Sequence, residues 1–223
     1  MNSAFPGVKT LVVIDDHPLV RHGLSQMINQ ERDLRIVGEA DNAAAGLAMI
    51  ESHNPDVVIV DITLPDRNGI ELVKDIRIRA PEVLVLTLSM HEEGLYAERV
   101  LRAGARGYVC KSENPARIIE AIRLIIDGGI FVSEKMSAKV LQTFVGIRGG
   151  RETPGVDSLS DRELEVLAMV GSGLSPREMA LAMHISVKTV AAHREHIKRK
   201  LNLANASELR KYAITWSQTR TSP

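Results

Sequence analysis

The stretch Val57-Val58-Ile59-Val60-Asp61 decides the fold of this chain. Four apolar, β-branched residues run directly into one carboxylate, and a loop that contains proline and glycine follows. Such a run without polar alternation is typical of a strand that is buried on both faces of a parallel sheet. Because open α/β sheets bind ligands at the carboxyl ends of their strands, we expect Asp61 to lie in a binding site.

The flanking sequence repeats this pattern, with strands that alternate with helices. Strand-like runs are expected at residues 9–15, 34–37, 57–61, 83–88 and 108–111. A segment with apolar residues at helical spacing follows each run. This order predicts an α/β fold with a five-stranded, parallel, doubly wound sheet and helices on both faces. Right-handed crossovers would place all the carboxyl ends at one edge of the sheet.

The composition is that of a globular protein from a reducing compartment. Hydrophobic residues make up 44% and charged residues 25% of the 223 residues, and the single cysteine excludes an internal disulfide. The apolar runs are too short for a membrane span and the N-terminus lacks a secretory pattern, so we expect a cytoplasmic protein with no membrane partner. An aromatic content of 3% argues against RNA-binding modules that stack bases.

Charge and composition divide the chain into segments. Residues 151–223 contain 11 Lys and Arg against 8 Asp and Glu, a net charge of +3, and the whole chain is neutral, so residues 1–150 carry −3. Residues 146–157 contain four glycines and one proline, which is typical of a flexible tether. We therefore predict a first domain at residues 8–127, a linker at residues 128–156 with a short helix at 134–144, and a second domain at residues 157–223.

Polar side chains stand at four of the predicted strand ends, where they should meet: Asp15, Asp16, Asp61, Thr87 and Lys111. Three carboxylates at one edge repel each other unless a cation lies among them, and an open site with few protein ligands suits Mg²⁺. The ion would hold an incoming phosphoryl group, which Asp61 would attack in line to become an aspartyl phosphate. Thr87 would donate a hydrogen bond to a phosphoryl oxygen, and Lys111 would add a positive charge.

Two other side chains near this edge are expected to take no part in the chemistry. His17 has no histidine or cysteine at metal-ligand spacing. Cys110 lies within an apolar run, which is typical of an inert thiol in the core.

The acidic residues and their spacing resemble the receiver domain of bacterial response regulators over about residues 8–124. The motifs DDHP at residues 15–18 and GARGY at residues 104–108 are similar to the NarL/FixJ branch in particular. The resemblance implies a flavodoxin-like receiver domain in which Asp61 is the phosphoacceptor. It also implies that a sensor histidine kinase, a separate protein, donates the phosphoryl group.

The same resemblance implies a set of metal ligands and a conformational switch. Mg²⁺ would be bound by the acceptor aspartate, by Asp16 and by the backbone carbonyl of Thr63, while Asp15 would act through water. Phosphorylation would draw Thr87 inward, and Tyr108 would turn into the space that Thr87 leaves. Such a change would bias a two-state surface through new hydrogen bonds and charge.

Four helix-capping patterns indicate a small all-α domain near the C-terminus. Ser160 and Ser175 each begin an S-x-x-E capping box, and Ser186 and Asn205 are further caps. The sequence therefore predicts four helices, the second and third of which form a helix-turn-helix at about residues 178–197.

The third of these helices has the features of a DNA recognition helix. Its small Ala191 and Ala192 could contact thymine methyl groups, Glu195 could accept a hydrogen bond from cytosine N4, and nearby cations could hold phosphates. A solvated charged face is the alternative. The candidate DNA-contacting residues are Lys188, Thr189, Ala191, Ala192, His193, Arg194, Glu195, Lys198 and Arg199.

Residues 159–213 resemble the LuxR-type helix-turn-helix through the motifs LSDRELEVL (159–167), GLS (173–175) and VKTV (187–190) with His193. The resemblance implies binding to double-stranded DNA. It implies a homodimer, when phosphorylated or bound to DNA, through a fourth helix that begins at NASEL (205–209), and RNA polymerase as a further partner. Family members often have a basic or amide residue where Glu195 stands.

We therefore expect a two-component response regulator that acts as a sequence-specific transcriptional regulator and is not an enzyme. Two other functions stay open at this point. The first domain could be only a dimerisation scaffold for a DNA-binding protein that ignores phosphorylation. Alternatively, Asp61 could be the nucleophile of a phosphatase, although such enzymes usually have a second acid two residues on, where this chain has Thr63.

Overall fold

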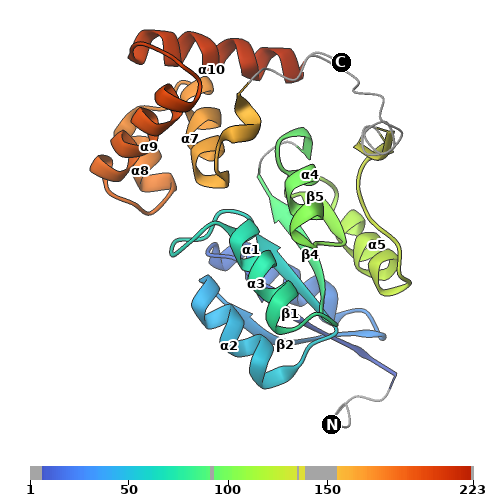
Figure 1. Ribbon diagram of the computed structural model, residues 1–223. Helices are drawn as coiled ribbons and strands as arrows, with labels where there is room; N and C mark the ends of the chain where they lie inside the picture. Colours follow the sequence, from blue (N-terminus) through green and yellow to red (C-terminus); the bar gives the residue numbers. More distant parts are fainter. Residues whose placement is uncertain (1–6, 91–92, 135, 139–154, 222–223) are drawn as a thin grey trace. The chain divides into compact units, whose positions relative to one another are not determined.

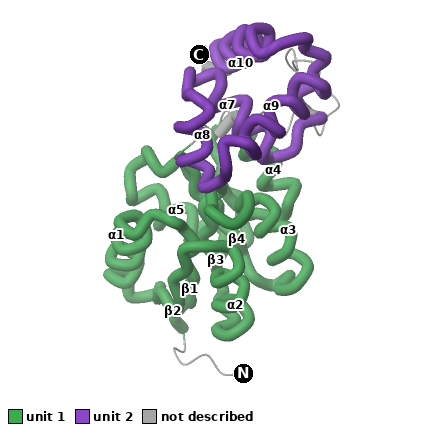
Figure 2. Tube along the Cα trace, turned by 90° about the vertical axis from the view of Figure 1, so that its left-hand side faces the viewer, with its two compact units in different colours: residues 1–147 green, residues 148–223 purple. Residues whose placement is uncertain are grey.

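The structure is a computed structural model that describes residues 7–90, 93–134, 136–138 and 155–221 (Figure 1). The chain divides into two compact units, residues 1–147 and 148–223, which are coloured separately in Figure 2. The domain boundaries that we predict at residues 127 and 157 are finer than this division and stay a prediction. Among the helices of the described ranges, none combines the length and the hydropathy needed to cross a bilayer.

Unit 1 is built on a five-stranded sheet, as predicted. Its strands are β1 (Lys9–Ile14), β2 (Leu34–Ala40), β3 (Val57–Asp61), β4 (Leu84–Ser89) and β5 (Gly107–Cys110). Neighbouring strands are all parallel, and the order across the sheet is β2-β1-β3-β4-β5. All five residues of β3 are buried, which explains why its sequence shows no polar alternation.

A helix follows each strand: α1 (Pro18–Asn29), α2 (Ala43–His53), α3 (Gly69–Arg79), α4 (Glu93–Ala103) and α5 (Pro115–Ile126). Asparagine side chains at residues 42, 68 and 114 accept hydrogen bonds from the first turns of α2, α3 and α5. Proline begins α1 and α5, where no intrahelical partner for its missing N–H is needed. These local signals determine where helices α1, α2, α3 and α5 begin.

The helices lie on both faces of the sheet (Figure 1). Helices α1 and α5 share one buried cluster with Leu11, Val57 and Leu86, which point to one face. Helix α2 packs on the other face, since Gly46 approaches Ile14 so closely that a Cβ there would collide with the isoleucine side chain. Helix α3 contacts both α2 and α4. The fold class that the sequence predicts is therefore confirmed.

The segment after α5 is described only in part. Phe131 forms a single parallel bridge with Gly107, the first residue of β5. Of the helix predicted at residues 134–144, residues 134 and 136–138 are helical, and residues 139–144 lie outside the described ranges. Most of the predicted tether, residues 146–154, also lies outside them.

Unit 2 is all-α, as predicted. A short 3₁₀ turn η1 (Val156–Ser158) precedes helices α7 (Asp161–Gly171), α8 (Pro176–Ala182), α9 (Val187–Lys200) and α10 (Ala206–Thr221). Ser160 and Ser175 form complete capping boxes with glutamates three residues on. The core of the unit joins Leu167 of α7, Val190 and Ile197 of α9, and Trp216 of α10, all of which are buried.

Candidate functional site

The strand ends of unit 1 bring together two acids and a lysine. The Nζ atom of Lys111, directly after β5, lies 2.6 Å from Oδ2 of Asp61 at the end of β3. The same Nζ lies 2.5 Å from Oδ2 of Asp15, which follows β1. All three side chains are at most 5% exposed. The parallel topology therefore places residues from distant parts of the sequence within one buried cluster of charge.

Two further residues of the DDHP motif complete a group of ligand atoms. One ligand atom from each of Asp15, Asp16, His17 and Asp61 can be chosen so that all four lie within 4.8 Å of one another. Three carboxylates at the open end of a sheet are the oxygen ligands that Mg²⁺ takes from proteins, so these residues fit that ion. We did not expect His17 in this group, because the spacing rule looks for other histidines or cysteines and overlooks neighbouring carboxylates.

The loop after β3 holds Thr63 beside the acceptor. The backbone N–H of Thr63 donates a hydrogen bond of 3.2 Å to Oδ1 of Asp61. The loop turns back at Gly69, whose N–H bonds the carbonyl of Ile62, and a Cβ at residue 69 would collide with the carbonyl oxygen of Asp61. Glycine is therefore required where α3 begins against the site.

Thr87 is buried on β4, but its hydroxyl has a partner that the sequence does not predict. It donates a hydrogen bond of 2.9 Å to the carbonyl oxygen of Gly107 on β5. Tyr108, which pairs with Thr87 in the sheet register, is also buried at 2% exposure. In this state the Thr87 proton is engaged between strands, so a bond to a phosphoryl group requires the side chain to turn.

The electrostatics of the cluster favour an added cation. Burial raises the pKa of Asp61 to about 6, and the charge of Asp15 adds to this, while Lys111 opposes it. Burial alone would lower the pKa of Lys111, but the two carboxylates raise it above its ordinary value. One ammonium therefore does not fully compensate the buried carboxylates, and a divalent ion would stabilise their ionised form.

The other residues of this edge have local roles. Cys110 is partly exposed, so the expectation of a core thiol is wrong, and its Sγ lies 3.0 Å from the hydroxyl oxygen of Ser112. The first three residues of β5 are buried, but Cys110, the last residue of the strand, is not. Asp66 accepts hydrogen bonds of 3.0 Å from the N–H groups of Ala43 and Ala44, at the start of α2.

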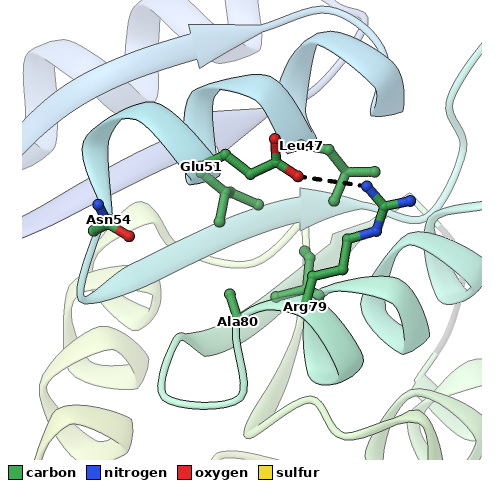
Figure 3. A pocket seen from close by; sticks show the side chains of 7 residues that line it. Leu47, Glu51, Asn54, Arg79 and Ala80 are labelled. Carbon is green, nitrogen blue, oxygen red and sulfur yellow. Dashed lines mark hydrogen bonds and ion pairs between the residues drawn. The ribbon is translucent and has the colours of Figure 1, made fainter.

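A cavity of about 170 Å³ lies between α2 and α3 (Figure 3). Its lining residues are Leu47, Ile50, Glu51, Asn54, Ile76, Arg79 and Ala80. Glu51 and Arg79 form an ion pair of 3.4 Å, drawn as a dashed line in Figure 3. The two charged groups of the lining thus neutralise each other, and none of the predicted site residues contributes to it.

In unit 2, helix α9 presents the candidate DNA surface. Val190 and Ile197 are buried on one face, as their spacing predicts. Exposed on the helix are Lys188, Thr189, Ala191, Ala192, Glu195 and Arg199, whereas His193, Arg194 and Lys198 are half-buried. All nine predicted DNA-contacting residues therefore lie on α9, and six of them are exposed.

Four of these residues already interact with other groups of unit 2: Thr189, His193, Glu195 and Lys198. The N–H of Thr189 donates to the Ser186 hydroxyl at 3.0 Å, which caps α9. Lys198 pairs with Glu195 at 2.9 Å. Burial lowers the pKa of His193, while the charge of Glu163 on α7 opposes this shift. A DNA contact by His193 would therefore compete with its position against α7.

An ion pair that the sequence analysis missed connects α9 to α7. Lys200 Nζ lies 2.6 Å from Oε2 of Glu163. Glu163 also accepts the N–H of Ser160 at 2.7 Å within its capping box, so one carboxylate caps α7 and binds α9. The capping-box motif predicts only the first of these roles, because the second depends on tertiary packing.

Comparison with known proteins gives a separate family match for each of the two units. The profile "Response regulator receiver domain" matches residues 11–123, and the profile "Bacterial regulatory proteins, luxR family" matches residues 157–213. The oxygen regulatory protein NreC of Staphylococcus carnosus is 34% identical over 208 residues, which cover 92% of this chain and 96% of NreC. The transcriptional regulatory protein DegU of Brevibacillus brevis is 30% identical over 211 residues and 89% of each chain.

A solved structure extends the likeness to both units. RcsB from Salmonella enterica serovar Typhimurium, bound to promoter P1flhDC in the presence of the phosphomimetic BeF3⁻, is 25% identical. The match covers 93% of this chain and 98% of the RcsB chain, with a TM-score of 0.61.

Proposed function

This chain belongs to the response regulators that join a receiver domain to a LuxR-type DNA-binding domain, and we propose that phosphorylation of Asp61 controls its binding to DNA. The observation that carries the proposal is the position of Asp61: a buried carboxylate at the end of β3, 2.6 Å from the ammonium of Lys111. The receiver is proposed to span residues 8–127 and the DNA-binding domain residues 157–223, with the linker between them.

The phosphoryl donor is proposed to be the phosphohistidine of a sensor kinase. A carboxylate oxygen of Asp61 forms a bond to phosphorus as the bond from phosphorus to the histidine nitrogen breaks. That nitrogen leaves with the electron pair, and the imidazole is restored. Lys111 stays beside the new acyl phosphate, where its charge offsets that of the added group.

Magnesium would be held by Asp16, Asp61 and the backbone carbonyl of Thr63, with Asp15 acting through water. When bound, the ion would neutralise the carboxylates and the phosphoryl oxygens, so that an anion can approach another anion. The N–H of Thr63 keeps the acceptor oriented through its bond to Oδ1 of Asp61.

The switch is proposed to begin at Thr87. When a phosphoryl group sits on Asp61, the Thr87 hydroxyl turns from the Gly107 carbonyl to a phosphoryl oxygen, and Tyr108 repacks into the space. The surface formed by α4 and β5 then changes and alters how the chain dimerises.

Helix α9 is proposed to enter the major groove of double-stranded DNA as part of a homodimer on two half-sites. Lys188 and Arg199 are exposed cations that suit phosphate contacts, and Ala191 and Ala192 allow close approach to bases. The Lys198 ammonium offsets the charge of Glu195, which makes an acid tolerable on this face. We propose that the protein acts in the cytoplasm, with double-stranded DNA, a sensor kinase and RNA polymerase as its partners.

The phosphatase alternative is disfavoured by the loop after Asp61. Such an enzyme needs an acid two residues after the nucleophile, and this chain has Thr63 at that position. The next acid, Asp66, is engaged by the N–H groups at the start of α2. The other alternative is a domain that serves only for dimerisation, and such a domain would not need Lys111 buried between two carboxylates.

Labelling with radioactive acetyl phosphate and Mg²⁺ tests the proposal. We expect close to one phosphate per chain in the wild type, released by hydroxylamine as an acyl phosphate should be, and none in Asp61→Asn. Asp66→Asn, in the same loop, is the matched control and should still be labelled. Full labelling of Asp61→Asn would assign the acceptor to another residue.

A further inference from the structure

His17 occupies a position in the acidic site that the proposed chemistry does not use. Its Nδ1 atom lies 2.6 Å from Oδ1 of Asp16 and 3.3 Å from Oδ1 of Asp15. Its backbone N–H also donates to Oδ1 of Asp15 at 2.9 Å, so the main chain at residue 17 is tied to the site. The imidazole is therefore held beside the carboxylates by its backbone as well as by its side chain.

The donor atoms fit a divalent ion with mixed nitrogen and oxygen ligands. One ligand atom from each of His17, Asp16 and Asp61 can be chosen so that the three lie within 4.8 Å of one another, and small side-chain movements would bring them to the spacing of ligands about 2.1 Å from one ion. The 2.6 Å contact between Nδ1 of His17 and Oδ1 of Asp16 is too short for two ligands of one ion and would have to open. The His17 side chain is 59% exposed, so its ring can rotate to admit an ion without disturbing the core.

An imidazole changes which ion such a site prefers. Carboxylates, carbonyls and water suit Mg²⁺, whereas imidazole suits first-row transition ions, whose affinities rise through the series from Mn²⁺ to Cu²⁺. A nitrogen ligand adds little for the hard Mg²⁺ ion but adds substantially for Co²⁺ or Ni²⁺.

We propose that His17 is a direct ligand of the divalent ion in the receiver site, and that it makes the site bind transition ions such as Co²⁺ and Ni²⁺ more tightly than its carboxylates alone would. The inference rests on the proposed function, because it takes Asp16 and Asp61 as ligands of that ion. It adds sensitivity to transition metals to a site otherwise suited to Mg²⁺.

Titration calorimetry of the full chain, stripped of metal and free of phosphodonor, tests the assignment. Replacing a residue next to a metal ligand typically lowers affinity about 10- to 100-fold, so loss of a direct ligand should cost at least about tenfold. We expect His17→Ala to lower the affinity for Co²⁺ by that factor and to change the affinity for Mg²⁺ by less than about twofold. His17 makes no side-chain cap bond to α1, so the substitution removes no helix cap.

His22→Ala is the matched control, since His22 is an exposed histidine on α1, the helix that His17 directly precedes. It should bind both ions like the wild type. The visible spectrum of bound Co²⁺ gives a second readout, because replacement of a nitrogen ligand by water shifts its absorption bands. An unchanged spectrum and Co²⁺ affinity in His17→Ala, or equal losses for Co²⁺ and Mg²⁺, would overturn the proposal.

Labelling by acetyl phosphate with Mg²⁺, in the same preparations, separates this inference from the proposed function. Labelled wild-type protein whose Co²⁺ binding is indifferent to His17 refutes only the histidine ligand. Wild-type protein that takes no label refutes Asp61 as acceptor, whatever the Co²⁺ titration shows.

Discussion

The hydroxyl of Thr87 donates a hydrogen bond of 2.9 Å to the carbonyl oxygen of Gly107, across the boundary between β4 and β5. A threonine hydroxyl has a single proton, so it cannot donate to Gly107 and to a phosphoryl oxygen at once. Tyr108, the next residue on β5, is the register partner of Thr87. The bond therefore stabilises the unmodified arrangement of the two strands at the point where the switch is proposed to act.

Replacing Thr87 by valine should separate phosphorylation from its effect on DNA binding. The variant keeps the shape of the side chain but loses a buried hydrogen bond, at a cost of about 1 kcal/mol in the free energy of unfolding. We expect Asp61 to be labelled as before, with little gain in DNA affinity. Thr87→Ser keeps the hydroxyl and should retain the gain. A full response in Thr87→Val would exclude the hydroxyl from the switch.

Asp61→Asn should be more stable than the wild type at neutral pH without metal. Burial raises the pKa of Asp61 from 3.8 to about 6, so the folded state binds this proton more tightly than the unfolded state does. The stability that Asp61 contributes is thus full below about pH 4 and is lost as the pH rises through 6. We expect a difference on the order of 1–3 kcal/mol at pH 7 that disappears near pH 4.

Urea denaturation in chelator at pH 4, 5 and 7 measures this difference. Glu51→Gln, which removes an exposed carboxylate outside the site, serves as the control and should show no such gain. If the Asp61→Asn protein were less stable than the wild type at pH 7, the assigned direction of the pKa shift would be wrong.

Magnesium should stabilise the wild type through the three acids. A ligand that binds only the folded state adds about 2.7 kcal/mol at one hundred times its dissociation constant. We expect the melting temperature to rise with Mg²⁺ concentration in the wild type and to stay nearly constant in Asp16→Asn. Asp41→Asn, which alters an exposed acid near α2, should respond like the wild type. An equal rise in Asp16→Asn would remove that residue from the ligands.

Lys188→Ala should weaken DNA binding to a similar degree on every duplex. Lys188 is exposed at the start of α9, and a phosphate contact carries no information about sequence. Loss of one such contact should reduce the slope of log affinity against log salt by about 0.9. Affinities at several salt concentrations, on a selected site and on an unrelated duplex, measure both effects. Weakening on the selected site alone would indicate a base contact instead.

The sequence predicts the acidic site well because the topology of a parallel sheet leaves few possible positions for the residues at its strand ends. Once five apolar runs are recognised as parallel strands, Asp15, Asp61 and Lys111 must meet at one edge of the sheet. In the structure the Nζ atom of Lys111 lies within 2.6 Å of a carboxylate oxygen of each aspartate. The caps of α7 and α8 are predictable for a similar reason, since a capping box is complete within four residues.

Contacts that depend on side-chain choice were not predictable. The rotation of Thr87 toward Gly107, the pairing of Glu195 with Lys198 and the bond from Lys200 to Glu163 each select one of several available partners. The position of His17 beside Asp16 does not follow from the spacing of histidines and cysteines, which takes no account of carboxylates. The two aspartates that directly precede His17 in the sequence are the signal for it.

The central claim is that the chemical state of Asp61 determines how tightly α9 holds DNA. Its most direct test compares the affinity of the full chain for a duplex selected from a random pool, with and without beryllium fluoride and Mg²⁺ as an acyl-phosphate mimic. Coupling between two sites typically changes affinity about 5- to 150-fold, so we expect a gain in that range for the wild type and none for Asp61→Asn. Equal affinities for treated and untreated wild type, or the same gain in Asp61→Asn, would contradict the claim.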